Sequence, residues 1–395
     1  MPKNKIDSVN KTSQCYQQEH IDVLDGIRIL TILIIVWFHF WQQSWIIPVM
    51  GKVSLDWIPR NGAILVDMMI LLSGFCLFLP YAKEMVYGTK TVPAKKFYIK
   101  RIARIFPSYY LCVIICLFCF ALPLKEYSGS EFMIKDLLAR IFFFSNFSLD
   151  TLFGTKLNGA LWTVCVEVQF YILFPFIARF FQKKPIVTYT IMILISIASC
   201  GIININSFNI NTWLYAHNSF TYSCVFANGM LGAWIYIAIT KYLKQNKLLD
   251  IASVVLAITG LYLYKLMCHS RMQSDDIYKW QIDNRFALSL VYLLIVFSIL
   301  MGQRIFNPLL GNKIMKFLAG ISYNLYIWHQ YISVKLKEFR IPYWEGTVPP
   351  NQTNDTVWMW KYLLICIAVS LLVAVLMTYM VEKPTAKYIL NKVKK

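Results

Sequence analysis

An arginine and a histidine lie eleven residues apart in the apolar stretch LDGIRILTILIIVWFHFW, residues 24–41. At about 100° per residue, a helix returns Arg28 and His39 to one face, about 16 Å apart along its axis. Charged and titratable groups at membrane depth are costly, so they usually face the interior of a bundle or a wet cavity. The spacing therefore predicts a functional face on this helix.

Further polar residues interrupt or open later apolar stretches: Asp67, Lys100, Arg101, Arg104, Glu167 and His329. A histidine can take a proton from a hydroxyl, and a carboxylate can orient the ring or balance its charge. A basic cluster can hold an anionic donor through charge-assisted hydrogen bonds. Together these residue types predict transfer to an acceptor hydroxyl, with a phosphate-bearing donor at the basic residues.

Most of these residues also have a simpler interpretation. The basic residues could be anchors that reach lipid phosphates, His329 could belong to an interfacial aromatic belt, and Asp67 could cap or pair with a neighbouring helix. Glu167 is harder to explain in this way. A carboxylate between LWTVCV and QFYILFP must find a partner or stay protonated.

Composition places the chain in a lipid bilayer. It is 58% hydrophobic and 15% charged, with a mean hydropathy of +0.52. The net charge of +19 arises from basic residues that fall between apolar runs, so we predict no nucleic-acid partner. Most of the ten cysteines lie inside apolar runs, and no metal-ligand spacing or cofactor-binding motif is present. We therefore predict neither a metal site nor a bound cofactor.

The elements that must position these residues are membrane-spanning helices, and the fold class predicted is an all-α polytopic membrane protein. Windows of mostly apolar residues predict about ten spans. They cover residues 24–42, 61–82, 101–122, 159–178, 186–206, 220–240, 249–267, 286–302, 317–334 and 359–381.

The distribution of Lys and Arg predicts the orientation of these spans. One set of loops, together with both tails, holds 24 Lys and Arg, whereas the opposite loops hold 14. The positive-inside rule then places both termini in the cytoplasm. We expect a cytoplasmic tail over residues 1–20, a transmembrane domain over 21–384 and a basic cytoplasmic tail over 385–395.

Two notable segments lie outside the predicted spans. The first twenty residues are polar and contain no apolar core, so we expect no cleavable signal peptide. The segment SEFMIKDLLARIFFFSNF, residues 130–147, is too charged to cross the membrane and too apolar for a free loop. It is either a helix in the outer interface or an ordered loop packed on the bundle.

Five motifs follow one another along the chain: LDGIRILTILIIVWFH, VDMMILLSGFCLF, FYIKRIARIFPSYY, LWTVCVEVQFYILFP and ISYNLYIWH. In these motifs and their order, the chain resembles the acyltransferase 3 family of integral membrane enzymes. Such enzymes move acyl groups from cytoplasmic acyl-CoA to hydroxyls of cell-surface glycans and related acceptors. The fourth motif departs from the family pattern, since Val168 stands where a second acidic residue is common.

The resemblance implies a role for each matching residue. His39 would be the general base, with Glu167 and Asp67 as further catalytic groups. Acyl-CoA, the co-substrate, would be bound by Arg28, Lys100, Arg101 and Arg104, and the supporting polar core would be Ser73, Tyr323 and His329. The family also implies a multi-pass protein of a bacterial plasma membrane, with acetyl as the expected acyl group and an extracytoplasmic glycan as the acceptor.

Two other functions fit the same sequence features. A transporter of a surface polysaccharide or lipid-linked sugar would also need many spans with a polar interior. A membrane module that serves another domain is a third alternative, although these 395 residues contain no stretch that we assign to such a domain.

Overall fold

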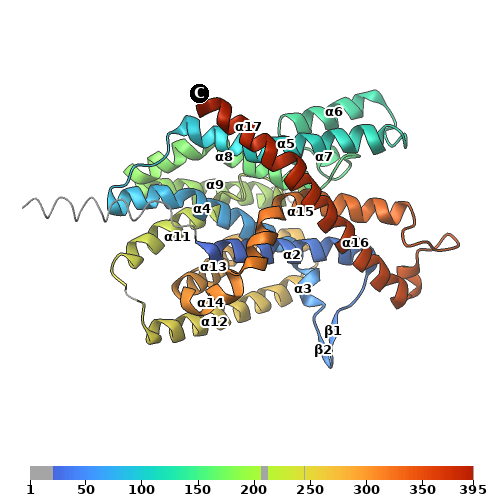
Figure 1. The fold of residues 1–395 in the computed structure, drawn as a ribbon. Helices are drawn as coiled ribbons and strands as arrows, with labels where there is room; N and C mark the ends of the chain where they lie inside the picture. The colour runs from blue at the N-terminus through green and yellow to red at the C-terminus, as the bar shows by residue number, and fades with distance from the viewer. Residues whose placement is uncertain (1–20, 206–211, 244, 395) are drawn as a thin grey trace, which may run out of the picture.

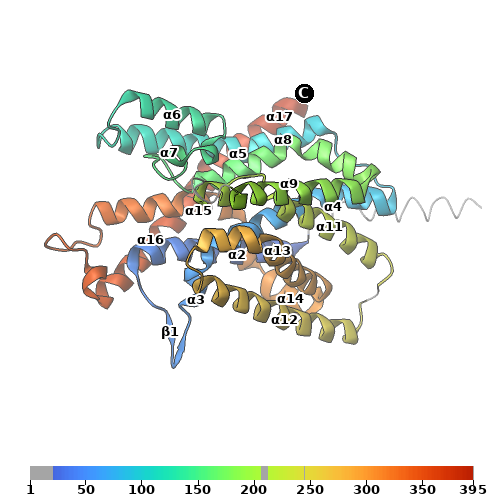
Figure 2. The ribbon, with the colours of Figure 1, turned by 180° about the vertical axis from the view of Figure 1, so that it is seen from behind.

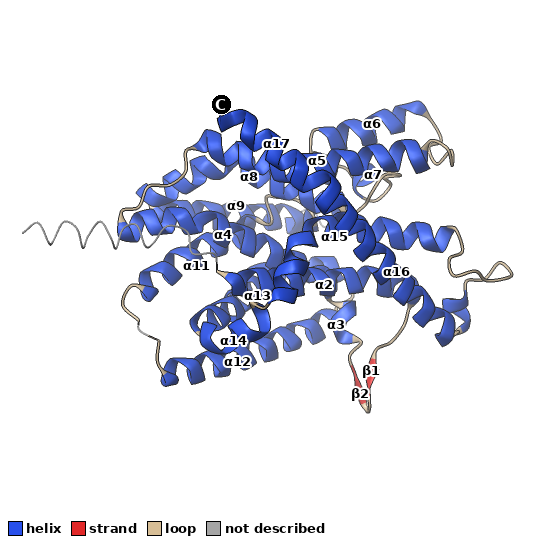
Figure 3. Ribbon diagram, viewed as in Figure 1, coloured by secondary structure: helices blue, strands red, loops and turns tan. Residues whose placement is uncertain are grey.

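The computed structural model describes residues 21–205, 212–243 and 245–394, which form helices and one small hairpin (Figures 1 and 3). The long helices are α2 (Asp22–Ser44), α4 (Leu65–Tyr87), α5 (Ala94–Ile115), α8 (Leu161–Lys183), α9 (Pro185–Ile205), α11 (Ser223–Thr240), α12 (Lys247–Met272), α13 (Ile277–Met301), α15 (Lys313–Glu338) and α16 (Thr356–Met377). The all-α prediction is confirmed.

Shorter elements join and extend these helices. They are β1 (Val49–Met50), β2 (Val53–Ser54), α3 (Trp57–Arg60), η1 (Gly62–Ile64), η2 (Cys116–Ala121), α6 (Ser130–Ile141), η3 (Ser145–Phe147), α7 (Leu149–Leu152), α10 (Thr212–Ala216), α14 (Gln303–Leu310), η4 (Pro350–Thr353), η5 (Thr378–Glu382) and α17 (Lys383–Lys394). The antiparallel hairpin β1–β2 projects away from the helices at the lower edge of the bundle (Figure 2). The segments η2 and η5 are π-helical and continue α5 and α16.

Eight helical stretches in the described part of the chain are long and apolar enough to cross a membrane, so the protein is a multi-pass membrane protein. The two other predicted spans are also helical. Of these, α9 supplies a shorter apolar stretch, and α15 contains four lysines in addition to its polar central residues. The number of ten crossings and the cytoplasmic position of both ends stay predictions.

Helix α2 lies between α4 and α15, and side-chain contacts give their directions. Arg28 contacts Cys76 of α4, while Thr31, further along α2, contacts Met68, so α2 and α4 are antiparallel. We call the end of the bundle where α2 begins, near Arg28, the basic end.

Helix α15 runs parallel to α2. Lys316 near its start forms an ion pair of 2.7 Å with Asp22, and the His329 ring lies 5.0 Å from the His39 ring. We call the end of the bundle near these two rings the histidine end. Because α2 and α15 are parallel neighbours, each of them contributes residues at both ends.

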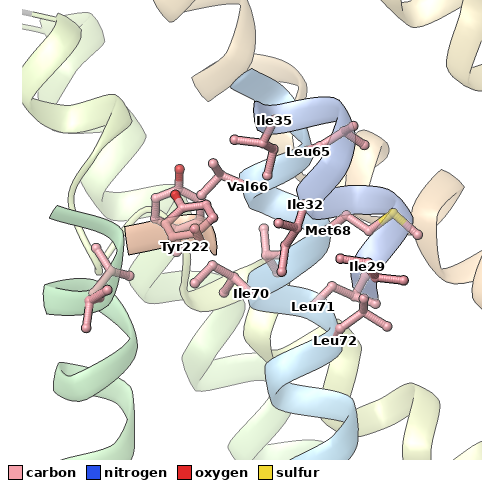
Figure 4. Packing of buried hydrophobic residues seen from close by; sticks show 14 of the residues in the cluster. Ile29, Ile32, Ile35, Leu65, Val66, Met68, Ile70, Leu71, Leu72 and Tyr222 are labelled. Atoms are coloured by element: carbon pink, nitrogen blue, oxygen red, sulfur yellow. The ribbon is translucent and has the colours of Figure 1, made fainter. Parts of the chain in front are cut away.

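The contact between α2 and α4 is mostly apolar and closely packed. Ile29, Ile32 and Ile35 of α2 are at most 2% exposed and lie beside α4 (Figure 4). On its other side, α4 approaches α11 so closely that a Cβ atom on Gly229 would lie 2.2 Å from the Leu71 carbonyl oxygen. Small residues at such contacts allow helix backbones to pack tightly within a membrane.

The segment predicted as an interfacial helix or an ordered loop contains α6. Asp136 and Arg140 are fully buried on one face of α6, whereas Ile134 and Leu138 are exposed. Tyr127 donates a hydrogen bond of 2.8 Å to Asp136. Burial and the Asp136 carboxylate raise the pKa of the Tyr127 hydroxyl, so it remains a donor. An exposed apolar face on a packed helix favours the interfacial alternative, which stays a prediction.

Candidate active site

Two histidines from distant parts of the sequence meet at the histidine end. His39 lies near the end of α2 and His329 lies on α15, and their ring centroids are 5.0 Å apart. His39 keeps part of its surface exposed, whereas His329 is fully buried. The structure therefore brings together the predicted general base, His39, and one residue of the predicted supporting polar core, His329.

The protonation of His329 follows from its hydrogen bonds. Its Nδ1 lies 2.7 Å from the Tyr326 carbonyl oxygen and 3.2 Å from that of Leu325. A carbonyl oxygen only accepts, so Nδ1 must hold the proton and Nε2 is an acceptor with a free lone pair. That buried Nε2 has no hydrogen-bond partner among the described residues.

His39 also has a hydrogen-bond partner at Nδ1, and this partner is an amide in place of the expected carboxylate. Nδ1 of His39 lies 3.0 Å from Oε1 of Gln42, one turn further along α2. With the amide oxygen as acceptor, Nδ1 carries the proton and Nε2 is basic. Within the described ranges, no hydrogen bond or ion pair joins a carboxylate to either imidazole, so Gln42 orients His39 without adding charge.

The basic end holds a carboxylate among cations. Glu167 of α8 accepts a hydrogen bond of 3.0 Å from Tyr171, and the Tyr171 hydroxyl lies 3.3 Å from Ser73 of α4. Arg28 and Arg101 lie within electrostatic range of Glu167 and of Tyr171. Glu167 therefore has the partners that its position in an apolar stretch required.

The three residues of α5 that were predicted to bind the donor differ in exposure. Lys100 and Arg104 are exposed, whereas Arg101 is partly buried, with its guanidinium 5.4 Å from the Tyr171 ring centroid. Its Nε has no hydrogen-bond partner among the residues that the structure describes. Arg101 thus retains donor capacity at the edge of the Glu167 cluster, as an anion-binding group would.

Helix α15 connects the two ends. Tyr323 donates a hydrogen bond of 3.0 Å to the Ile105 carbonyl oxygen and lies within electrostatic range of Glu167. One turn further, Tyr326 is also within range of Glu167, and its ring centroid is 5.5 Å from that of His329. The polar and aromatic face of α15 therefore runs from the basic end to the histidine end.

Asp67 lies apart from both clusters. Its carboxylate forms an ion pair of 2.9 Å with Arg285 and accepts a hydrogen bond of 2.8 Å from Gln281, and all three side chains are buried. Arg285 also donates to Thr221 and to the Ala216 carbonyl oxygen. This arrangement matches the simpler interpretation of Asp67, in which it pairs with a neighbouring helix.

Sequence reasoning missed Arg285 because it started the eighth span at residue 286. Helix α13 begins at Ile277, so Arg285 lies inside it. A signal was present, since a buried Asp67 requires a cation or a hydrogen-bond donor. Tyr171, Tyr326 and Gln42 were also missed, and their types alone gave no reason to select them.

Comparison with known proteins gives one family. The model of a family described as an acyltransferase domain matches residues 21–379. The chain belongs to this family. The resemblance found in the sequence motifs is thereby confirmed.

Named relatives of this acyltransferase-family chain come from Staphylococcus aureus. O-acetyltransferase OatA of strain NCTC 8325 / PS 47 is 22% identical over 355 residues, which cover 86% of this chain and 54% of OatA. Putative O-acetyltransferase SACOL0978 of strain COL is 23% identical over 342 residues, covering 81% of this chain and 52% of that protein. The chain thus spans about half the length of the curated relatives it matches. No solved structure matches the chain.

Proposed function

We propose that this family member is a bacterial plasma-membrane O-acetyltransferase. It would move an acetyl group from acetyl-CoA at the basic end to a hydroxyl of an extracytoplasmic glycan at the histidine end. The family and the names of the relatives support acetyl transfer to oxygen. One observation supports transfer from the basic end to the histidine end. Helices α2 and α15 each run from the Glu167 and arginine cluster to the histidine pair.

The residues present suit one balanced step. Nε2 of His39 takes the proton of the acceptor hydroxyl while the hydroxyl oxygen forms a bond to the thioester carbonyl carbon. The carbon–sulfur bond then breaks, and the CoA thiolate leaves and receives the proton from the imidazolium. Gln42 holds the tautomer of His39 that this step requires.

The cations at the basic end suit the phosphate-bearing part of the donor. Arg28, Arg101 and the exposed Lys100 and Arg104 offer charge-assisted hydrogen bonds to phosphate groups. Arg28 and His39 are separated by about 16 Å along α2, so the thioester must extend from the bound phosphates on a flexible arm.

The test uses purified protein in proteoliposomes with labelled acetyl-CoA and extracted envelope glycans. We expect label in a glycan ester, released CoA, and a loss of at least about 100-fold in His39→Ala. A matched control is His217→Ala, because His217 packs against Trp162 and lies outside the clusters described above. Acceptor movement without CoA release would instead establish transport, and full activity of His39→Ala would remove His39 from the step.

A further inference from the structure

The histidine pair contains a binding group that the proposed step does not use. His329 is fully buried, and its Nε2 is an acceptor without a partner among the described residues. The hydrogen bonds from Nδ1 to the Tyr326 and Leu325 carbonyl oxygens keep Nε2 unprotonated, because they hold the only proton of the neutral ring at Nδ1. A buried acceptor without a donor is unfavourable, so a ligand that supplies a donor would bind there.

The surroundings of His329 restrict what that donor can be. Its ring packs against Phe40 and Tyr326 as well as His39, with centroid distances of 6.3, 5.5 and 5.0 Å. A trapped water needs two to four polar partners, and the two Nε2 acceptors would supply only the lower number. His39 offers no donor in the tautomer that Gln42 sets, because its Nδ1 proton already points to the amide oxygen.

Two adjacent imidazole acceptors match a ligand with two adjacent donors. The hydroxyls of a vicinal diol, the arrangement common on sugar rings, are such a pair. We propose that His329 binds the hydroxyl next to the one that is acetylated, so that the acceptor is recognised as a vicinal diol. This inference rests on the proposed function: the reacting hydroxyl donates to Nε2 of His39 and its neighbour donates to Nε2 of His329.

The assignment makes His329 a residue that determines specificity. A site built to hydrogen-bond a substrate hydroxyl rejects an analogue that lacks it, because the buried protein group is then left without a partner. The neighbouring hydroxyl would thus select both the sugar and the position that is acetylated. A purely structural His329 would affect all acceptors equally.

The test combines substrate and protein changes. The acceptors are the methyl glycoside of the sugar that the wild-type protein labels and its monodeoxy derivatives. For the derivative that lacks the neighbouring hydroxyl, we expect kcat/KM of the wild type to fall by about 10- to 100-fold. His329→Phe keeps a ring of similar shape without Nε2. The kcat/KM values of this variant for the methyl glycoside and for the deoxy derivative should therefore be nearly equal. His329→Gln, which retains an acceptor oxygen, should restore part of the preference.

An undiminished preference in His329→Phe, or equal use of both acceptors by the wild type, would overturn the inference while leaving acetyl transfer intact. A second measurement needs no turnover. The chain has five histidines, so ¹⁵N-histidine NMR can follow the His329 Nε2 signal during titration with the methyl glycoside. We expect a shift with the diol and none with the deoxy compound, and equal responses to both would refute the assignment whatever the rate of transfer.

Discussion

The ion pair between Asp67 and Arg285 allows a structural role to be separated from a catalytic one. The sequence motifs imply catalysis by Asp67, whereas the structure surrounds its carboxylate with Arg285 and Gln281. The decisive perturbations are Asp67→Leu, Arg285→Met and their combination. If the pair is structural, each single change should destabilise the protein and the double change should recover much of the loss.

The magnitudes follow from the contacts. Asp67→Leu removes two buried hydrogen bonds and leaves a buried guanidinium without its counter-charge, and breaking such a pair costs about 3–5 kcal/mol. Arg285→Met leaves the carboxylate with Gln281 and should cost a similar amount. The double variant buries no charge and removes one partner each from Gln281, Thr221 and the Ala216 carbonyl oxygen, about 2 kcal/mol in all. The two effects should therefore be non-additive by about 3 kcal/mol or more.

The assay is thermal unfolding in detergent, followed by size-exclusion chromatography, with acetyl transfer measured on the folded fraction. Each single variant should lower the apparent Tm by about 5–10 °C, and the double variant by about half of that. The folded double variant should transfer acetyl at close to the wild-type rate. A double variant that is folded but has lost transfer more than about 100-fold would show that Asp67 acts on substrate, and the structural assignment would fail.

Three further predictions concern other parts of the bundle. Arg101→Gln should raise KM for acetyl-CoA about 10-fold and leave the acceptor KM unchanged, as measured by steady-state kinetics; an equal rise in both would argue against donor binding. Tyr171→Phe removes the hydrogen bond to Glu167 and should cost about 1 kcal/mol of stability in denaturant titrations, and an unchanged midpoint would contradict this. Gly229→Ala should lower the yield of folded protein because its Cβ meets the Leu71 carbonyl, whereas Gly320→Ala, where nothing lies within 4 Å, should not; equal yields would refute the packing argument.

Much of the helical framework could be predicted from the sequence because membrane helices need long apolar runs. Each of the ten predicted ranges overlaps a helix of the structure. The errors lie at helix ends, where hydropathy changes gradually and cannot mark a boundary. The start of α13 shows the consequence, because Arg285 fell outside the predicted span and the partner of Asp67 was lost with it.

The sequence indicated several residues of the two polar clusters, but not how the helices arrange them. Periodicity placed Arg28 and His39 on one face, but it could not show that α15 runs parallel to α2 and brings His329 to His39. The expectation of a carboxylate beside the histidine came from chemistry alone, and the structure has Gln42 there instead. Such partners depend on how helices pack, which a single helix period does not encode.

The parallel arrangement of α2 and α15 also limits how the donor can reach the histidines. Arg28 and His39 are on one helix, so their axial separation of about 16 Å changes only if α2 bends or unwinds. The ion pair of Asp22 with Lys316 at the basic end and the His39–His329 contact at the histidine end join α2 to α15 at two levels. A donor bound as proposed would therefore span a fixed distance with its own flexible part, without a motion that brings the arginines to the histidines.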